Sequence, residues 1–206
     1  MNKPGSINTI IFDLGGVLID WNPRYVYRNI FKTEEEIDWF FENICTNDWN
    51  EEQDAGKLLN EATEELVALH PAWENQIRAY YGRWEEMLGG VIQETVDILQ
   101  ELKQNKDLKL YALTNWSAET FPIALERFEF LKWFDGIVVS GVEKTRKPFP
   151  EFYHRLIDRY GINPSESIFI DDNLRNVEGA QSLGVKGIHF KNPEQLKHEL
   201  NQIIKK

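Results

Sequence analysis

The 206-residue sequence predicts an α/β fold, a doubly wound parallel sheet with a small α-helical cap inserted after the first strand. Two observations predict the sheet. The first apolar run, Ile7 to Phe12, has the β-branched composition of a strand covered on both faces. From residue 90 onwards, short apolar runs alternate with helical segments of about 10 to 15 residues, as in βαβ units. A third observation predicts the cap, because residues 23–89 contain many Glu and aromatic residues and no convincing strand.

The first strand ends at Phe12, and Gly15 and Gly16 follow where the backbone must turn tightly or approach a ligand closely. Breaks between the helices of the insertion are expected at residues 32–33, 47–50, 56 and 70–71. Thr33 and Glu36 match a capping box at the first of these breaks, because their spacing lets each side chain bond the other residue's backbone N–H.

After the insertion the sequence returns to an alternation of strands and helices. Helices are expected over residues 93–104, 118–127, 150–160 and 174–183 and from Pro193 onwards, and strands over residues 108–113, 136–140, 167–170 and 186–190. We therefore expect residues 1–20 and 90–206 to form the core domain and residues 21–89 to form the cap.

Charge and cysteine content restrict the class of protein. With a net charge of −11, no basic stripe is expected for nucleic acid, and an anionic partner must be attracted by local positive charge. The polar start, Met1 to Asn8, and the lack of an apolar run of roughly 20 residues predict no membrane segment and a cytoplasmic location. The single cysteine, Cys45, excludes an intrachain disulfide and a cysteine-based metal cluster. Nothing in the sequence predicts the oligomeric state.

Polar residues directly follow three of the predicted strands. Asp13 follows the first strand, Thr114 and Asn115 follow the second core strand, and Asp171 and Asp172 follow a later one. Parallel strands collect their carboxyl ends along one edge of the sheet, so these side chains are expected to meet in one crevice.

These groups suit metal-assisted phosphoryl transfer, although each also has a structural interpretation. Asp13 can attack phosphorus and form an aspartyl phosphate, or it can cap a turn. The hydroxyl and amide at positions 114 and 115 can bond a phosphoryl oxygen or start a helix. Lys147 can neutralise phosphoryl charge or lie solvated on the surface. The carboxylates at 171 and 172 repel each other, which Mg²⁺ would relieve, unless the pair lies in an exposed loop.

Together, four segments resemble the four motifs of the haloacid dehalogenase-like hydrolase superfamily. They are residues 11–18, residues 113–115, residues 146–148, and residues 169–173 with Asn176 and Val177. The resemblance covers the whole predicted core, and the insertion is similar to the helical cap of that superfamily. Among its branches the chain is most similar to sugar-phosphate phosphatases related to glucose-1-phosphate phosphatase and to the phosphatase domain of soluble epoxide hydrolases.

The resemblance implies a Mg²⁺-dependent phosphatase that hydrolyses a small phosphorylated metabolite, such as a sugar phosphate, through an aspartyl phosphate. Asp13 would be nucleophile and metal ligand, with the backbone carbonyl of Gly15 as a second ligand. Asp172 would bind the metal directly and Asp171 through a water. The resemblance also implies that Thr114 and Lys147 hold the phosphoryl group and that Asn115 shapes the same pocket.

One position departs from the pattern of these phosphatases, which place a second aspartate two residues after the nucleophile to protonate the leaving oxygen. This chain has Gly15 there. Such acid–base help is typically worth about 10²- to 10⁴-fold in rate, so either the leaving group is good, as in a sugar 1-phosphate, or another group serves. Asp20 is a candidate substitute, and it is also a natural start for the turn at Asn22 and Pro23. Trp21 and Trp116 are candidates for contact with the substrate.

The missing aspartate leaves two alternatives open. A dehalogenase would use Asp13 to attack carbon without a metal, with Arg24, Arg28 and Trp21 as a halide cradle, although the paired carboxylates would repel an anionic haloacid. A catalytically impaired relative would bind a phosphorylated ligand without turnover.

Overall fold

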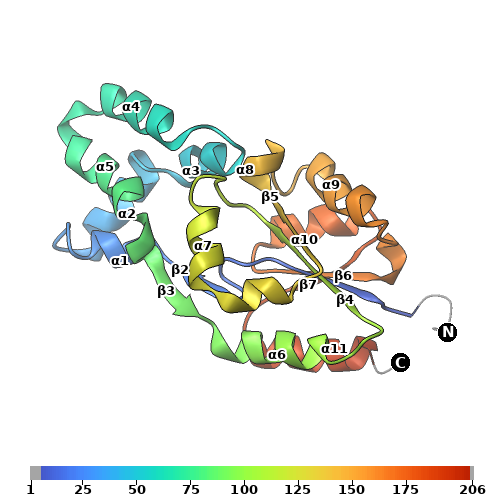
Figure 1. The fold of residues 1–206 in the computed structure, drawn as a ribbon. Coiled ribbons are helices and arrows are strands. Elements are labelled where there is room, and N and C mark those ends of the chain that lie inside the picture. The colour runs from blue at the N-terminus through green and yellow to red at the C-terminus, as the bar shows by residue number, and fades with distance from the viewer. Residues whose placement is uncertain (1–5, 205–206) are drawn as a thin grey trace.

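The computed structural model describes residues 6–204 and has a five-stranded parallel sheet at its centre (Figure 1). Its strands, in spatial order, are β5 (Gly136–Val139), β4 (Lys109–Thr114), β1 (Thr9–Phe12), β6 (Ser167–Asp171) and β7 (Lys186–His189). The predicted doubly wound α/β fold is thereby confirmed. Residues 1–5, which belong to the predicted polar start, lie outside the described residues, as do residues 205–206.

The chain order of the strands creates a switch point at β1. From β1 the chain passes to β4 and β5 on one side, and then to β6 and β7 on the other. Thr9 of β1 is in register with Lys109 of β4 and with Ser167 of β6. The carboxyl ends of β1, β4 and β6 therefore lie next to one another, which is where open α/β sheets bind their ligands.

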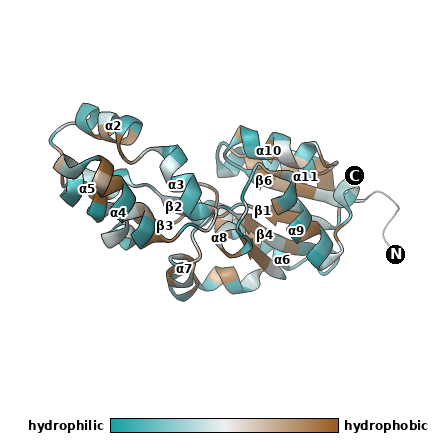
Figure 2. Cartoon of the chain, turned by 90° about the horizontal axis from the view of Figure 1, so that it is seen from above, coloured by the Kyte–Doolittle hydropathy of each residue, from teal (hydrophilic) through white to brown (hydrophobic). Residues whose placement is uncertain are grey.

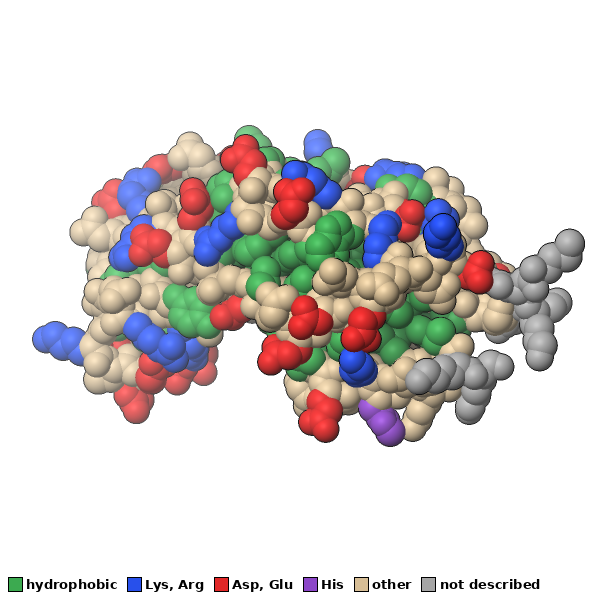
Figure 3. Space-filling model, turned by 60° about the horizontal axis from the view of Figure 1, so that its bottom comes forward, with side chains coloured by type: hydrophobic (Ala, Val, Ile, Leu, Met, Phe, Trp, Pro, Cys, Tyr) green, Lys and Arg blue, Asp and Glu red, His purple; other side chains and the backbone are tan. Residues whose placement is uncertain are grey.

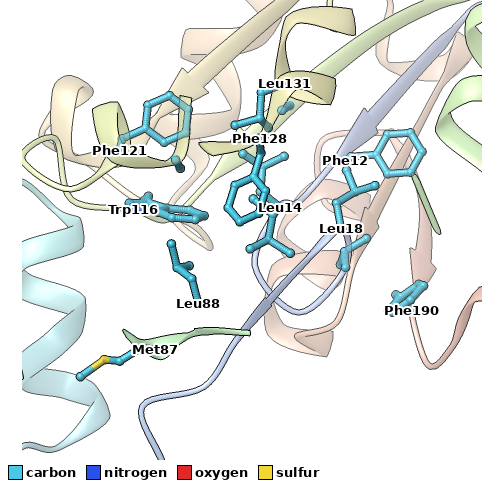
Figure 4. Close-up of a cluster of buried hydrophobic side chains, with 14 of the residues drawn as sticks. Phe12, Leu14, Leu18, Met87, Leu88, Trp116, Phe121, Phe128, Leu131 and Phe190 are labelled. Atoms are coloured by element: carbon cyan, nitrogen blue, oxygen red, sulfur yellow. The ribbon is translucent and has the colours of Figure 1, made fainter. Parts of the chain in front are cut away.

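Helices cover both faces of this sheet (Figures 1 and 2). They are α6 (Gln93–Lys103), α7 (Phe121–Arg127), α8 (Ser140–Glu143), α9 (Pro150–Tyr160), α10 (Leu174–Gln181) and α11 (Pro193–Ile204), with the 3-10 turns η3 (Glu129–Trp133) and η4 (Pro164–Glu166). Ile10 and Phe12 of β1 pack in the cluster that includes α6, α7 and α11 (Figure 4), whereas Ile11 packs with α9 and α10. This alternation of the strand's side chains buries both faces of the sheet.

The cap consists of helices that leave the core between β1 and α6 (Figures 1 and 2). They are α1 (Arg24–Tyr27), α2 (Glu34–Asn43), α3 (Asn47–Asp54), α4 (Leu59–Leu69) and α5 (Glu74–Gly82), with the 3-10 turns η1 (Pro71–Trp73) and η2 (Trp84–Met87). The expected capping box of Thr33 and Glu36 begins α2. Most cap aromatics pack together: the ring of Tyr27 lies 5.1 Å from that of Phe40 and 5.0 Å from that of Phe41.

A short antiparallel ribbon, which was not predicted from the sequence, joins the cap to the core. Strands β2 (Ile19–Trp21) and β3 (Leu88–Val91) pair with each other. The expectation of no strand within residues 23–89 was therefore wrong where β3 begins, at residues 88–89. The two glycines in β3 disfavour a strand on local grounds. Gly89 is needed here for steric reasons, because a Cβ at this position would lie 2.2 Å from a carboxylate oxygen of Asp20, whereas Gly90 has a positive φ of 130°.

Element ends differ slightly from the predictions. α7 begins at Phe121 rather than at residue 118, since Pro122 favours the first turn of a helix. β4 and β6 each run one residue further than expected, so that Thr114 and Asp171 end their strands. α8 was not predicted.

The surface is mixed in charge on the face shown in Figure 3, where Lys and Arg side chains are scattered among Asp and Glu. Among the described residues, no helix combines the length and the apolar character that a membrane span requires.

Candidate active site

Asp13 lies at the carboxyl end of β1 and is almost fully buried. Its Oδ1 atom accepts hydrogen bonds from the backbone N–H of Leu14 at 2.7 Å and from Nζ of Lys147 at 2.9 Å. The Asp13 backbone N–H continues the pairing with β6 by donating to Ile170. The strand pairing and the bond to Leu14 therefore fix the carboxylate at the switch point of the sheet.

The second acidic pair comes from the end of β6. Asp171 is fully buried, and its oxygens accept from Lys147 Nζ at 2.7 Å, from the Asn173 backbone N–H at 2.8 Å and from Asn176 Nδ2 at 3.1 Å. Asp172 is more exposed. One carboxylate oxygen from each of Asp13, Asp171 and Asp172 lies within 4.8 Å of the others, so the structure brings the three predicted acids together.

Lys147 lies fully buried between two of these acids. The side-chain amide of Asn115 holds the backbone of Lys147: Asn115 Nδ2 donates to the Lys147 carbonyl at 3.1 Å, and Asn115 Oδ1 accepts from the Lys147 N–H at 2.9 Å. Burial alone would lower the pKa of Lys147, but the adjacent carboxylates of Asp13 and Asp171 outweigh it and raise that pKa. The lysine is therefore held as a cation.

The acids carry more charge than the lysine can balance. Burial raises the pKa of Asp13, with opposition from Lys147 and reinforcement from Asp171 and Asp172. Burial and the neighbouring Asp171 also raise the pKa of Asp172. With all four groups ionised, the three carboxylates and one ammonium leave two net negative charges. A divalent cation would offset them, and carboxylate oxygens are the ligands that Mg²⁺ prefers, so the donor set fits that ion.

Thr114, the last residue of β4, contributes a buried hydroxyl to the same edge of the sheet. Its Oγ1 has no hydrogen-bond partner among the described residues. Buried polar atoms are rarely left unpaired, so an unsatisfied hydroxyl here suits a ligand oxygen.

A pocket adjoins these residues between core and cap. Its cavity of about 70 Å³ is small beside the roughly 300–1,000 Å³ of typical small-ligand sites. Its walls combine core residues, Trp21 from the ribbon and residues of the cap: Gly15, Trp21, Asn50, Asp54, Tyr81, Trp84, Asn115, Trp116, Ser117 and Thr120. Trp21 and Trp116 thus line the pocket. The Trp116 ring N–H finds no acceptor within the described part of the chain.

The structure places other candidates away from the pocket lining. The carboxylate of Asp20 accepts a hydrogen bond from the Tyr25 hydroxyl at 2.6 Å within the ribbon and α1 region. Arg24 forms ion pairs with Glu34 and Asp38 on the cap surface, and Glu34 also pairs with Arg28.

Two cap residues that the fold brings to the site were not predicted from the sequence. Glu51 of α3 is buried and forms ion pairs with Arg146, next to Lys147, and with Arg175 at the start of α10. Asp54, one turn later, lines the pocket. Both are acids in an acidic helix, and only their tertiary surroundings distinguish them from exposed neighbours.

Comparison with known proteins now defines the family. The model of the haloacid dehalogenase-like hydrolase family matches residues 7–184. The chain belongs to this family. It is therefore a hydrolase, and the resemblance seen in its four motifs is confirmed.

Individual relatives cover most of the chain. Sesquiterpene phosphatase astK of Aspergillus oryzae is 31% identical over 94% of this chain and 95% of that protein. Phosphorylated carbohydrates phosphatase of Thermotoga maritima is 24% identical over 89% of this chain and 84% of that protein. The chain spans only 37% of another relative, drimenol cyclase drtB of Aspergillus calidoustus, at 26% identity.

A solved structure shows the same fold. The family enzyme bt-2542 of Bacteroides thetaiotaomicron, in complex with magnesium and inorganic phosphate, superposes with a TM-score of 0.70 at 24% identity and covers 94% of this chain and 99% of its own.

Proposed function

We propose that this hydrolase is a Mg²⁺-dependent phosphomonoesterase that acts on a small phosphorylated metabolite, with Asp13 as its nucleophile. The observation that carries the proposal is the grouping of Asp13, Asp171 and Asp172 around the buried ammonium of Lys147. When all four groups are ionised, their two net negative charges at the end of a parallel sheet suit a divalent cation, and a cation plus a lysine suits a phosphoryl dianion.

The residues that would hold the ion are Asp13, Asp171, Asp172 and the backbone carbonyl of Gly15. Bound there, Mg²⁺ would neutralise the phosphoryl oxygens and reduce their repulsion of the attacking carboxylate. The likeness to bt-2542, whose structure contains magnesium and phosphate, supports this assignment.

The protein's own groups then have distinct roles. Asp13 attacks phosphorus, and the bond from phosphorus to the leaving oxygen breaks, which gives an aspartyl phosphate that water hydrolyses to inorganic phosphate. The ammonium of Lys147 and the unpaired hydroxyl of Thr114 hold the phosphoryl oxygens. Asn115 positions Lys147 through its backbone. The cap excludes bulk water from the pocket during transfer.

The lining of the pocket favours a substrate whose leaving group is small and has an apolar face. Trp21, Trp84 and Trp116 provide flat surfaces, and sugar rings and hydrocarbon chains both pack on such surfaces. Relatives named as phosphatases of carbohydrates and of sesquiterpenes support phosphate esters of these two classes.

The test is phosphate release from a panel of sugar phosphates and terpenyl phosphates, with Mg²⁺ and with EDTA. We expect release only with Mg²⁺, and none from Asp13→Asn. Chloride release from 2-chloroacids in EDTA would instead support a dehalogenase. The ion pairs of Arg24 and Arg28 on the cap surface argue against that alternative. Tight binding of phosphate esters with no release of either ion would support a binding protein.

A further inference from the structure

We propose that Asp54, on helix α3 of the cap, protonates the leaving oxygen and later activates the water, in the place of a second core carboxylate. This inference rests on the proposed phosphatase function. Both steps need a group that exchanges a proton. Cleavage releases an alkoxide unless the leaving oxygen receives a proton, and hydrolysis of the aspartyl phosphate requires the attacking water to lose a proton.

The core position at which related phosphatases place this acid carries no side chain in this protein. Gly15 lies two residues after Asp13 and lines the pocket. A Cβ at Gly15 would meet no atom within 4 Å, so the space that a side chain would fill there is open. A group that enters the pocket from the cap therefore has unobstructed room at this position.

Asp54 is the carboxylate that lines this pocket together with Gly15 and Asn115. Asn50, one turn earlier on α3, donates from Nδ2 to Asp54 Oδ2 at 3.2 Å, and the Tyr81 hydroxyl in turn donates to Asn50 Oδ1 at 3.0 Å. This chain of hydrogen bonds orients the carboxylate from the cap side.

The surroundings of Asp54 also suit proton exchange near neutral pH. Burial and the neighbouring Glu51 raise the pKa of Asp54 to about 7, while Arg146, Lys147 and the backbone amide of Ser117 oppose the shift. A group with a pKa near the working pH populates both of its protonation states, as an acid that must also act as a base requires.

Glu51 fixes helix α3 over the core. It lies three residues before Asp54 and on the same face of the helix. Glu51 binds Arg146 at 2.7 Å and also pairs with Arg175. These two arginines flank the catalytic lysine and the acidic pair in sequence. These ion pairs thus hold α3, and Asp54 with it, against the two segments that carry the phosphoryl site.

Asp20 is the competing candidate. It lies in β2, bonds the Tyr25 hydroxyl and packs against Gly89, and it is not among the residues that line the pocket.

The experiment compares two esters whose leaving groups differ in their need for a proton, p-nitrophenyl phosphate and benzyl phosphate, in the Mg²⁺-loaded full-length enzyme. For Asp54→Asn we expect kcat/KM for benzyl phosphate to fall about 10²- to 10³-fold and kcat/KM for p-nitrophenyl phosphate to fall less than about 5-fold. Glu52→Gln, an exposed acid on the same helix, is the matched control and should change neither rate. Retained activity on p-nitrophenyl phosphate also shows that the variant is folded.

A rescue sharpens the test. Because Gly15 has open space, Gly15→Asp in the Asp54→Asn background should restore benzyl phosphate hydrolysis at least about 10-fold. Four results would each overturn the inference and leave the phosphatase proposal intact. They are equal losses on both esters in Asp54→Asn, no loss in that variant, a selective loss on benzyl phosphate in Asp20→Asn instead, and no rescue by Gly15→Asp. A wild-type enzyme that hydrolyses neither ester with Mg²⁺ overturns both.

Discussion

Replacing Lys147 by Met is the perturbation that tests the electrostatics of the site most sharply. The side chain is fully buried, and its ammonium lies 2.9 Å from Asp13 Oδ1 and 2.7 Å from Asp171 Oδ2. Met has a similar length and no charge, so the change removes the cation without opening a large cavity. Three carboxylates then remain within 4.8 Å of one another with no protein cation between them.

The structure sets the size of the effect. Each hydrogen bond to a charged group contributes about 1.5–3 kcal/mol, so two of them give about 3–6 kcal/mol. Removing one partner of a buried ion pair typically costs ~3–5 kcal/mol, which agrees. The destabilisation should shrink as the pH falls, because acids whose pKa is raised in the folded state take up protons there and lose their repulsion.

The assay is urea unfolding in EDTA at pH 8 and pH 5.5, read by tryptophan fluorescence. We expect Lys147→Met to lose about 3–5 kcal/mol at pH 8 and less at pH 5.5, with part of the loss recovered when Mg²⁺ is added. Lys132→Met is the matched control, because Lys132 pairs with Glu129 on the surface, and it should lose less than about 0.5 kcal/mol. A loss below about 1 kcal/mol at pH 8, or one that grows as the pH falls, would refute the reasoning.

Three further predictions concern the other groups of the site. Thr114→Val should lower kcat/KM about 10- to 100-fold and leave stability unchanged or up to ~1 kcal/mol higher, because the buried hydroxyl has no partner among residues 6–204; a loss of stability contradicts this. Gly16→Ala should abolish the rise in Tm that Mg²⁺ causes, since a Cβ would lie 2.3 Å from Asp172 Oδ2, whereas Gly161→Ala, with positive φ but open space, should keep it. Glu51→Gln should raise KM about 5-fold, or ~1 kcal/mol, by loosening the cap, and an unchanged KM would argue against that role.

Much of the fold was predictable because local signals and tertiary structure agree. α9 begins at Pro150 and ends at Tyr160 as expected, with a proline at its start and Gly161 in a left-handed conformation after its end. The β2–β3 ribbon was not predictable, because Gly89 and Gly90 in β3 weaken the strand signal. The small size of Gly89 matters only against Asp20 and Tyr25, which the fold brings beside it.

The residues of the candidate site also fall into those that the sequence predicted and those that it did not. Asp13, Thr114 and Asp171 were found because each lies at the carboxyl end of a strand of the parallel sheet, and sheet topology alone brings them together. Asp54 and Glu51 were not found, because they lie on a polar helix whose placement over the sheet depends on ion pairs with Arg146 and Arg175. No sequence spacing encodes those contacts.

The central claim, that the Asp13 carboxylate accepts the phosphoryl group, is tested most directly by mass spectrometry of enzyme quenched in acid during turnover of p-nitrophenyl phosphate with Mg²⁺. We predict a phosphorylated peptide with the phosphoryl group on Asp13, which disappears in EDTA and in Asp13→Asn. A phosphoryl group on another residue, or active turnover with no phosphorylated peptide, would contradict the account.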